Sequence, residues 1–431
     1  MRTLPTEHKR ASTRRGKRPS VISLYTGAGG LDLGFEAAGF DTRVAVEFDQ
    51  DAVKTLRHNR DWPVIDDDIH SDRASSANLL KTSGLREGDA SLLIGGPPCQ
   101  PFSKSGYWAN GDALRLADPR ASTLGAYLRV LRDTLPQAYL IENVPGLAFS
   151  SKDEGLEFLK KEIQKINRET GSSYSFSTAV LRAVDYGVPQ DRQRVFIIGH
   201  REGLEFEFPN PTHRTAGVED VITPRGSHDL SRALTAWDAI GDLEDDDSPI
   251  LAITGKWAEL LPTIPEGKNY LHHTDRGPGL PLFGWRRRYW SFLLKLAKSM
   301  PSWTIAAQPG PAIGPFHWKS RRLSAKELGR IQTFPDGYEV LGSLRAAQKQ
   351  IGNAVPSALA ELLGLEIRRQ FMGQKGLDPA RLTLLPSYRA DLPPPEPIAP
   401  VPANYRKLVG THEAHPGTGK GYGAVRRAAL G

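Results

Sequence analysis

The stretch that decides the fold is VISLYTGAGGLDLGFEAAGFDTRVAVEFD, residues 21–49. It contains an apolar run at 21–25, a glycine-rich turn at 26–30, and apolar residues at helical spacing that stop near Gly39. A second apolar run follows at 44–46 and ends in a carboxylate. This order predicts a strand, a turn, a helix and a second strand, which is the repeating unit of a parallel sheet with helices on its faces.

The chain continues this alternation. We expect further strands at 92–94, 138–141 and 195–198, and a helix at about 123–135 between the first two of them. Strands that alternate with helices predict the α/β class, with a doubly wound and mostly parallel sheet.

After the last of these strands the pattern changes. The stretch 203–320 is rich in Pro and Gly, shows no strand–helix rhythm and holds six of the eight tryptophans, so we expect a separate, irregular domain there. Helices are predicted again at 324–332 and 353–371. The basic start, 1–19, and the Pro-rich end, 373–431, are predicted to be disordered tails, with a DNA-binding arm as the alternative for the first.

Composition sets limits on function. Lys and Arg number 56 against 49 Asp and Glu, and this excess suits a polyanionic partner without proving one. The single cysteine, Cys99, excludes a disulfide framework and a Cys-rich zinc site. The pair His272-His273 has no third ligand at metal spacing, so we expect a structural or polar role and no metal. No apolar run is long enough to span a bilayer, and we expect a cytoplasmic protein.

The glycine turn is the first candidate site. Gly27, Gly29 and Gly30 lie between a strand and a helix, where backbone amides approach a ligand closely. Glu47 ends the next strand, where such folds bind ribose hydroxyls, and Asp68 adds a carboxylate suited to an adenine amino group. The turn lacks the full dinucleotide spacing, so these residues alone leave open a nucleotide-like cofactor or a tight structural turn.

Two further candidates follow predicted strands. Cys99 lies in PPCQPFS at 97–103, just past a strand, where open α/β sheets place reactive groups; this context favours a nucleophile over a buried core thiol. Glu142 follows the strand at 138–141 at the same sheet edge. A catalytic carboxylate and a simple cap or ion pair are both consistent with that position.

Arginines and aromatics form two more patterns. Gln190, Arg192 and Arg194 share one face if they lie in a strand, and that face is either solvated or turned to an anion or base edge. The run FGWRRRYW at 283–290 suits nucleic-acid contact, or equally an amphipathic helix with its Trp residues in the core.

Six motifs, in this order, resemble those of the cytosine-5 DNA methyltransferases over about residues 20–370. They are YTGAGGL at 25–31, GPPCQ at 96–100, ENV at 142–144, QxRxR at 190–194, RRLS through RxQxFP at 321–335, and QIGNAVP at 350–356. Departures are small: Tyr25 stands where the family usually has Phe, and Ser357 where a second Pro is common.

The resemblance implies a Rossmann-like methyltransferase domain that binds S-adenosylmethionine. The cofactor contacts that it implies are Tyr25, Gly27, Gly29, Gly30, Leu31, Glu47, Phe48, Asp68, Ile69, Pro98 and Asn353. It divides the chain into a catalytic domain at 20–202, a target recognition domain at 203–320, and late helices at 321–372 that return to the catalytic domain.

The resemblance also implies a reaction. The thiolate of Cys99 adds to carbon 6 of a cytosine that has flipped out of double-stranded DNA within a short specific sequence. Glu142 hydrogen-bonds or protonates ring nitrogen 3, Arg192 approaches the cytosine carbonyl, and Arg192 and Arg194 orient the base and Glu142. A loop at 102–106 closes over the base.

The family suggests a monomer that acts at the nucleoid, alone or beside a restriction endonuclease with the same target site. Three alternatives remain open: an RNA cytosine methyltransferase, a non-catalytic regulator with this fold, and a nicotinamide dehydrogenase. The long aromatic region at 203–320 counts against the first, the presence of Cys99 and Glu142 against the second, and the incomplete glycine spacing against the third.

Overall fold

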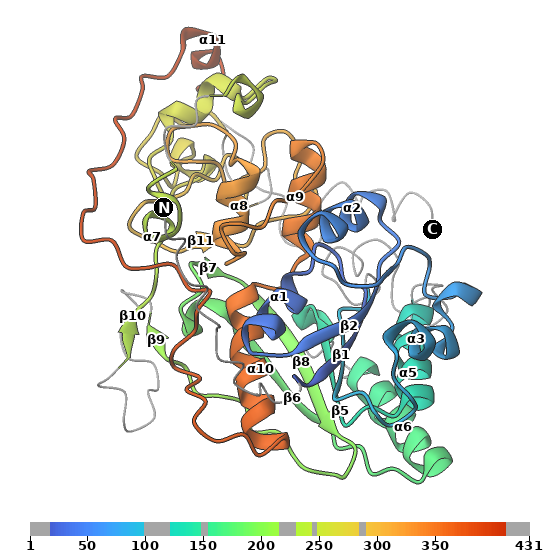
Figure 1. Cartoon of the computed structure of the whole chain (residues 1–431). Coiled ribbons are helices and arrows are strands. Elements are labelled where there is room, and N and C mark those ends of the chain that lie inside the picture. The colour runs from blue at the N-terminus through green and yellow to red at the C-terminus, as the bar shows by residue number, and fades with distance from the viewer. Residues whose placement is uncertain are drawn as a thin grey trace, which may run out of the picture.

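A seven-stranded sheet forms the centre of the first half of the chain (Figure 1). Its order is β3-β2-β1-β4-β5-β8-β6, and neighbours from β3 to β5 are parallel, whereas β8 runs against both β5 and β6. The predicted mostly parallel α/β sheet is confirmed. Its strands are β1 (Ser20–Leu24), β2 (Asp41–Val46), β3 (Val64–Ile65), β4 (Leu92–Gly95), β5 (Ala138–Asn143), β6 (Ser177–Arg182) and β8 (Gln193–His200).

The structure is a computed structural model, and it describes residues 18–98, 121–147, 154–214, 230–243, 248–283 and 290–410. The expected nucleophile Cys99, the loop at 102–106 and most of the aromatic and basic run lie outside the described residues. No helix within the described ranges is long and apolar enough to cross a membrane.

Helices cover both faces of the sheet because its central strands are apolar on both sides. One face packs Ile22 and Leu24 against α3, α5 and α6, and the other packs Val21 against α1 and α10. The helices are α1 (Gly30–Ala37), α2 (Gln50–Asn59), α3 (Ser76–Ser83), α5 (Ala121–Thr134), α6 (Glu154–Thr170) and α10 (Ser357–Phe371).

Helix α10 comes late in the chain but packs closely on α1 (Figure 1). Small residues make this approach possible: a Cβ at Gly34 would lie 2.3 Å from the carbonyl oxygen of Ser357, and one at Gly364 would lie 2.6 Å from Ala38 Cβ. Larger side chains at these two glycines would push the helices apart.

Two predicted boundaries shift. Strand β5 extends to Asn143, so Glu142 lies inside the strand rather than after it. The single helix predicted at 353–371 begins instead at Ser357, and Asn353 is the last residue of α9 (Leu344–Asn353). Pro356 explains the break, because a proline disfavours helical conformation in the residue before it and lacks a donor for the preceding turn.

The helix predicted at 324–332 is present as α8 (Ala325–Ile331). It begins after Ser324, whose hydroxyl accepts the backbone N–H of Glu327, while the Glu327 carboxylate accepts the backbone N–H of Ser324. This reciprocal cap is the reason the helix starts there.

The region at 203–320 is irregular, as predicted from its composition. Its described part contains only short elements: β9 (His213–Arg214), β10 (Ser231–Arg232), α7 (Ala236–Ile240), β11 (Ser302–Trp303), and 3-10 turns at Pro249–Leu251, Ala258–Thr263 and Tyr270–His273. It has an apolar cluster of its own, centred on Tyr270, Phe283 and Phe292. Strand β11 pairs with β7 (Gln190–Asp191), which fixes this region beside the sheet.

A second apolar cluster joins this region to the late helices. Trp237 and Trp318 pack with Leu328 of α8 and Ile351 of α9. Helices α8 and α9 therefore lie between the irregular region and the sheet, and only α10 covers the sheet itself.

The prediction of a disordered tail at 373–431 is wrong for residues 373–410. We call this segment the C-terminal strap. It runs along the edge of the molecule, drawn in red in Figure 1, and ends in α11 (Ala403–Arg406). Leu382 and Leu384 pack on the sheet's cluster, and Tyr405 is buried in the cluster of the irregular region. The Pro-rich composition predicted disorder because the contacts that order this segment come from distant parts of the chain.

Candidate active site

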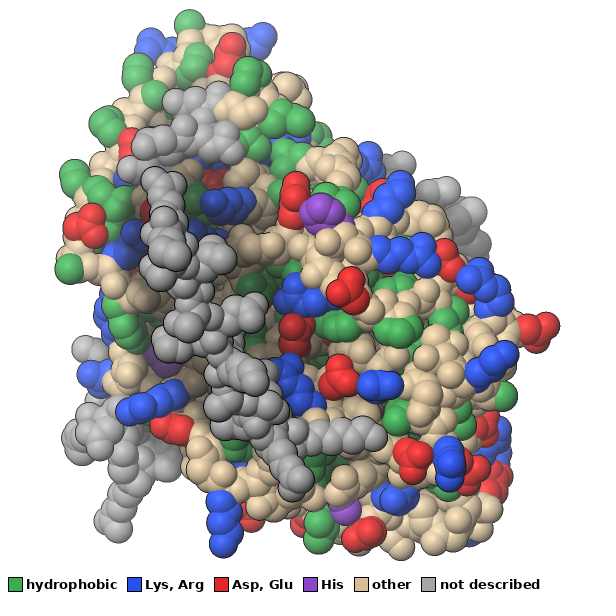
Figure 2. Space-filling model, in the orientation of Figure 1, with side chains coloured by type: hydrophobic (Ala, Val, Ile, Leu, Met, Phe, Trp, Pro, Cys, Tyr) green, Lys and Arg blue, Asp and Glu red, His purple; other side chains and the backbone are tan. Residues whose placement is uncertain are grey.

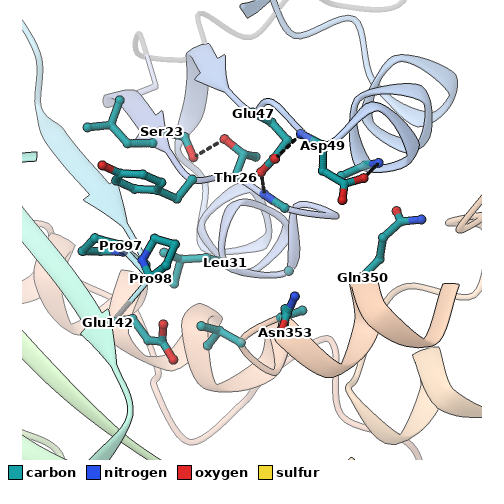
Figure 3. A pocket seen from close by; sticks show the side chains of 18 of the residues that line it. Ser23, Thr26, Leu31, Glu47, Asp49, Pro97, Pro98, Glu142, Gln350 and Asn353 are labelled. Carbon is teal, nitrogen blue, oxygen red and sulfur yellow. Dashed lines mark hydrogen bonds between the residues drawn. The ribbon is translucent and has the colours of Figure 1, made fainter. Parts of the chain in front are cut away.

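A cavity of about 400 Å³ opens at the carboxyl ends of β1, β2, β4 and β5, where parallel sheets bind ligands (Figure 3). Sheet-edge loops form one side of it and the turn between α9 and α10 forms the other. Its wall includes Tyr25, Gly27, Gly30, Leu31, Glu47, Phe48, Asp49, Pro97, Pro98, Glu142, Arg194, Lys349, Asn353, Ala354 and Val355.

The three glycines of the turn serve different needs. Gly27 and Gly29 have φ angles of +56° and +80°, which favour glycine, and Gly29 is the N-cap of α1. A Cβ at Gly30 would lie 2.6 Å from the carbonyl oxygen of Val355, so Gly30 permits the late turn to close over the site. Gly27 and Gly30 line the cavity, whereas Gly29 faces Leu56 and does not.

Glu47 is held in place from two sides. Its carboxylate accepts the backbone N–H of Gly27 and that of Asp49, each at 2.7 Å. Burial raises the pKa of Glu47, and these backbone hydrogen bonds partly offset that effect. The result is a fixed acceptor at the end of β2, with the ring of Phe48 beside it, 62% exposed and free to lie against a flat ligand.

Asp68 and Ile69 do not line the cavity. Asp68 is exposed and accepts the backbone N–H of His70 at 2.8 Å, and Ile69 is buried in the core against the helices. The structure therefore brings together the other predicted cofactor residues except Gly29, and leaves these two outside the wall.

The chain that leads to Cys99 is fixed at the cavity edge. The carbonyl oxygen of Pro97 accepts Asn143 Nδ2 at 3.1 Å, and that of Pro98 accepts the Thr123 hydroxyl at 3.1 Å. Asn143 was part of a predicted motif, but this anchoring function was not foreseen.

Glu142 and Arg194 form a buried ion pair on the cavity wall. Arg194 Nε lies 2.8 Å from Glu142 Oε1, and both side chains are largely buried. The second carboxylate oxygen, Oε2, has room because Gly96 has no side chain. A Cβ at that position would lie only 2.7 Å from Oε2. Burial raises the pKa of Glu142, and the charges of Arg194 and Arg192 oppose that rise.

Arg192 does not line the cavity, although the family resemblance implies that it approaches the cytosine carbonyl. Its Nη2 donates to the carbonyl oxygen of Gly352 at 2.8 Å and its Nη1 to that of Ile305 at 3.3 Å, and it is absent from the cavity wall. The alternation predicted from QxRxR fails because β7 ends at Asp191 and β8 begins at Gln193. The solvated alternative is also wrong for Gln190 and Arg192, since both are buried.

Sequence reasoning missed Lys349 and Gln332. Lys349 lines the cavity, and its Nζ pairs with Asp49 Oδ2 across the mouth at 2.5 Å. Gln332 is buried behind the late turn and contacts both Gln190 and the end of α9. The only signal for either was its position within or next to a motif.

The aromatic and basic run is described only at its ends. Phe283 is a core residue, and Trp290 is exposed with its ring against Trp303 at 5.9 Å. His273 has the structural role expected of it: it hydrogen-bonds the Thr263 hydroxyl at 2.7 Å, and burial lowers its pKa to about 4.

Charge on the visible face is mixed. Lys and Arg side chains alternate with Asp and Glu over the sheet part of the molecule, rather than forming one basic patch (Figure 2). This agrees with a net charge of only +7.

The family model and the sequence relatives point to the same protein family. Residues 20–369 match the family model of the C-5 cytosine-specific DNA methylases. The chain is 39% identical to the Type II methyltransferase M.SacI of Streptomyces achromogenes, over 85% of this chain and 96% of that protein. It is 32% identical to the Type II methyltransferase M.NgoFVII of Neisseria gonorrhoeae, over 79% and 83%.

Solved structures show the same fold. A Spodoptera frugiperda DNMT2 mutant superposes with a TM-score of 0.53 at 17% identity, covering 81% of this chain and 99% of that one. The Entamoeba histolytica methyltransferase EhMeth gives 0.53 at 17% identity, covering 82% and 99%. At this identity the likeness concerns the fold alone.

Proposed function

The chain belongs to the C-5 cytosine-specific DNA methylase family, and from this premise we propose which of its residues perform the reaction. The activity itself is that of a DNA (cytosine-5-)-methyltransferase with S-adenosylmethionine as methyl donor. The dehydrogenase, RNA-modifying and non-catalytic alternatives are not supported.

The observation that carries the proposal is that the Glu142–Arg194 pair and the Glu47–Phe48 end of β2 line one cavity. A volume of about 400 Å³, a fixed carboxylate for ribose hydroxyls and an exposed aromatic ring fit a nucleoside cofactor. Glu47, Phe48 and Asn353 are the residues we assign to it. When bound, it supplies an electrophilic methyl group on a positively charged sulfur.

Glu142 activates the cytosine in this proposal. Burial raises the pKa of Glu142, so its carboxyl group can take up a proton on Oε2 and share it with ring nitrogen 3, while Arg194 holds Oε1. The thiolate of Cys99 forms a bond to carbon 6, and the electron pair displaced from the ring makes carbon 5 nucleophilic. After methylation, a water removes the proton from carbon 5, the bond between carbon 6 and the Cys99 sulfur breaks, and ring nitrogen 3 returns its proton to Glu142.

Recognition of the target is assigned to 203–320, on double-stranded DNA with the cytosine flipped out of the stack. This region lies beside the cavity because β11 pairs with β7, next to the arginine segment. We propose, as the names of the Type II relatives suggest, that the enzyme modifies the site of a restriction endonuclease at the nucleoid and acts as a monomer. Light scattering should then give 47.3 kDa.

Bisulfite sequencing tests the proposal. DNA is taken from a host that lacks cytosine-5 methylation and expresses either this protein or the Cys99→Ala variant. Methylation within one short motif, absent in the variant, and protection of that motif from an endonuclease that cuts it, are the expected results. Methylation that persists in Cys99→Ala would remove the covalent mechanism.

A further inference from the structure

Arg192 is a buried cation in an unusual setting. It is 1% exposed, its Nε has no hydrogen-bond partner, and no carboxylate in the described part of the chain forms an ion pair with it. Its hydrogen bonds go to two main-chain carbonyl oxygens, those of Ile305 and Gly352. A buried charge is costly without specific partners, and these two carbonyls and the nearby charge of Glu142 offset part of that cost.

One of these carbonyls belongs to the end of a helix. Gly352 lies in the last turn of α9, where carbonyl oxygens lack partners within the helix and carry a partial negative charge. Arg192 binds the one at Gly352, and Gln332 Nε2 binds those of Ile351 at 2.7 Å and Ala354 at 3.2 Å. Two buried side chains thus cap the end of α9 from outside.

The capped turn forms the cofactor side of the cavity. Asn353, Ala354 and Val355 all line the wall, and Gly30 closes on Val355 from the glycine turn. Any shift of the end of α9 therefore moves this wall against the glycine turn.

The same segment also reaches the base side. Arg192 stands two positions before Arg194, which holds Glu142. Gln190 supports the arrangement, because its Nε2 donates to Gln332 Oε1 at 2.9 Å and its Oε1 accepts the Ile305 N–H at 3.1 Å.

We propose that Arg192 is a positioning residue that sets the cofactor wall at 353–355 and the Arg194–Glu142 pair in fixed relation to each other. This inference rests on the proposed function of the cavity. It replaces direct contact between Arg192 and the cytosine by an action through the end of α9.

The test measures S-adenosylmethionine affinity without DNA, so that base contact plays no part. In Arg192→Met we expect the dissociation constant to rise about tenfold or more, since a hydrogen bond from a charged group is lost. The KM for the cofactor should rise with it, while kcat at saturating cofactor falls less. Arg194→Lys should do the reverse: a lower kcat, with cofactor affinity within about twofold of the wild type.

A matched control separates positioning from general loss of stability. Arg201 also donates to main-chain carbonyls, those of Gly88 and Leu135, but it does not line the cavity. Arg201→Met should lower the melting temperature and leave cofactor affinity unchanged. If Arg201→Met weakened cofactor binding as much as Arg192→Met does, Arg192 would act only through stability, and the inference would be overturned.

If Arg192→Met does not fold, Arg192→Lys keeps the charge and one donor, and it is compared with Asn353→Ala in a double-mutant cycle. Affinity losses that add fully would contradict action through Asn353, and a double variant no weaker than Asn353→Ala would support it. An unchanged cofactor affinity with a reduced kcat would assign Arg192 to the base instead. A wild-type protein that neither binds S-adenosylmethionine nor methylates DNA would refute the proposed function, which is a different failure.

Discussion

The sheet part of this molecule and its irregular region at 203–320 are held together in different ways. In the sheet, Ile22 and Val21 face opposite layers of helices, and the backbone groups are paired strand to strand. In the irregular region, contacts come from far along the chain: Trp237 packs 5.8 Å from Trp318, and its Nε1 donates to the carbonyl oxygen of Asp391 in the strap.

This difference matches a division of labour. Glu47, Glu142 and Arg194 need fixed positions, and they lie in or directly after strands whose register is set by the sheet. The irregular region depends on α8, α9 and the C-terminal strap for its order. Scaffolds of this second kind tolerate variation in their surface loops, as recognition of different sequences requires.

The largest expected effect tests whether chemistry is confined to the sheet part. Glu142→Gln should lower turnover by about 10²–10⁴-fold, because the proton donor to the base is lost. The melting temperature should also fall, because Gln leaves the largely buried guanidinium of Arg194 without its carboxylate partner. Methyl transfer from labelled cofactor and a thermal melt measure the two. Wild-type turnover in this variant would show that the buried pair is structural.

The second prediction perturbs only the irregular region. Tyr405 is 5% exposed, stacks near Trp257 and donates its hydroxyl to the Lys256 carbonyl oxygen at 2.6 Å. Tyr405→Ala should destabilise this region by about 3 kcal/mol. In hydrogen exchange, amides of 257–273 should lose protection, whereas those of β1 and β4 should keep theirs. Cofactor affinity should stay the same.

Ile398→Ala is the control for this change, because Ile398 lies in the same strap but is 55% exposed. Its effect should stay within about 0.5 kcal/mol. Equal loss of protection in both parts of the molecule after Tyr405→Ala would mean that they unfold as one unit, and the contrast drawn above would not hold.

The third prediction concerns pH. Burial raises the pKa of Glu142 from its ordinary value, so the protonated form is present below that raised pKa and is lost as the pH climbs through it. The rate should therefore fall by about tenfold per pH unit on the alkaline side of that pKa. Rate profiles of the wild type and of Glu142→Gln are compared, and an identical alkaline limb in both would assign that limb to another group.

The smallest expected effect concerns the ion pair between Lys349 and Asp49 at the cavity mouth. Burial alone would raise the pKa of Asp49, but hydrogen bonds from Lys349 and the start of α2 lower it overall. The Asp49 carboxylate is therefore ionised at neutral pH, and the ion pair is lost as the pH falls through the lowered pKa of Asp49. Lys349→Met should weaken cofactor binding about two- to fivefold, as expected of a partly exposed ion pair, and reduce its salt dependence. A loss of tenfold or more would show direct contact between Lys349 and the cofactor.

The sequence predicted the sheet part well, because apolar runs, glycine turns and polar strand ends are local signals. It placed Glu47 and Glu142 each at the end of a strand, and both line the cavity. The role of Arg192 was not predictable, since it depends on carbonyls at 305 and 352 that only the folded chain brings near. The strap was mistaken for a disordered tail for the same reason: Tyr405 is buried in the cluster of the irregular region and donates its hydroxyl to Lys256, 149 positions earlier in the chain.

The packing of α10 on α1 also limits how early during synthesis the fold can be completed. The apolar side of α1 emerges from the ribosome early, but its cover arrives with α10, where Arg368 contacts the Ala38 carbonyl oxygen across 330 positions of sequence. At about 5–20 residues per second, the nascent chain carries that uncovered surface for tens of seconds. Translation that stops before Ser357 yields a chain in which α1 is present but lacks the helix that packs on it, so synthesis of nearly the whole family region precedes completion of the fold.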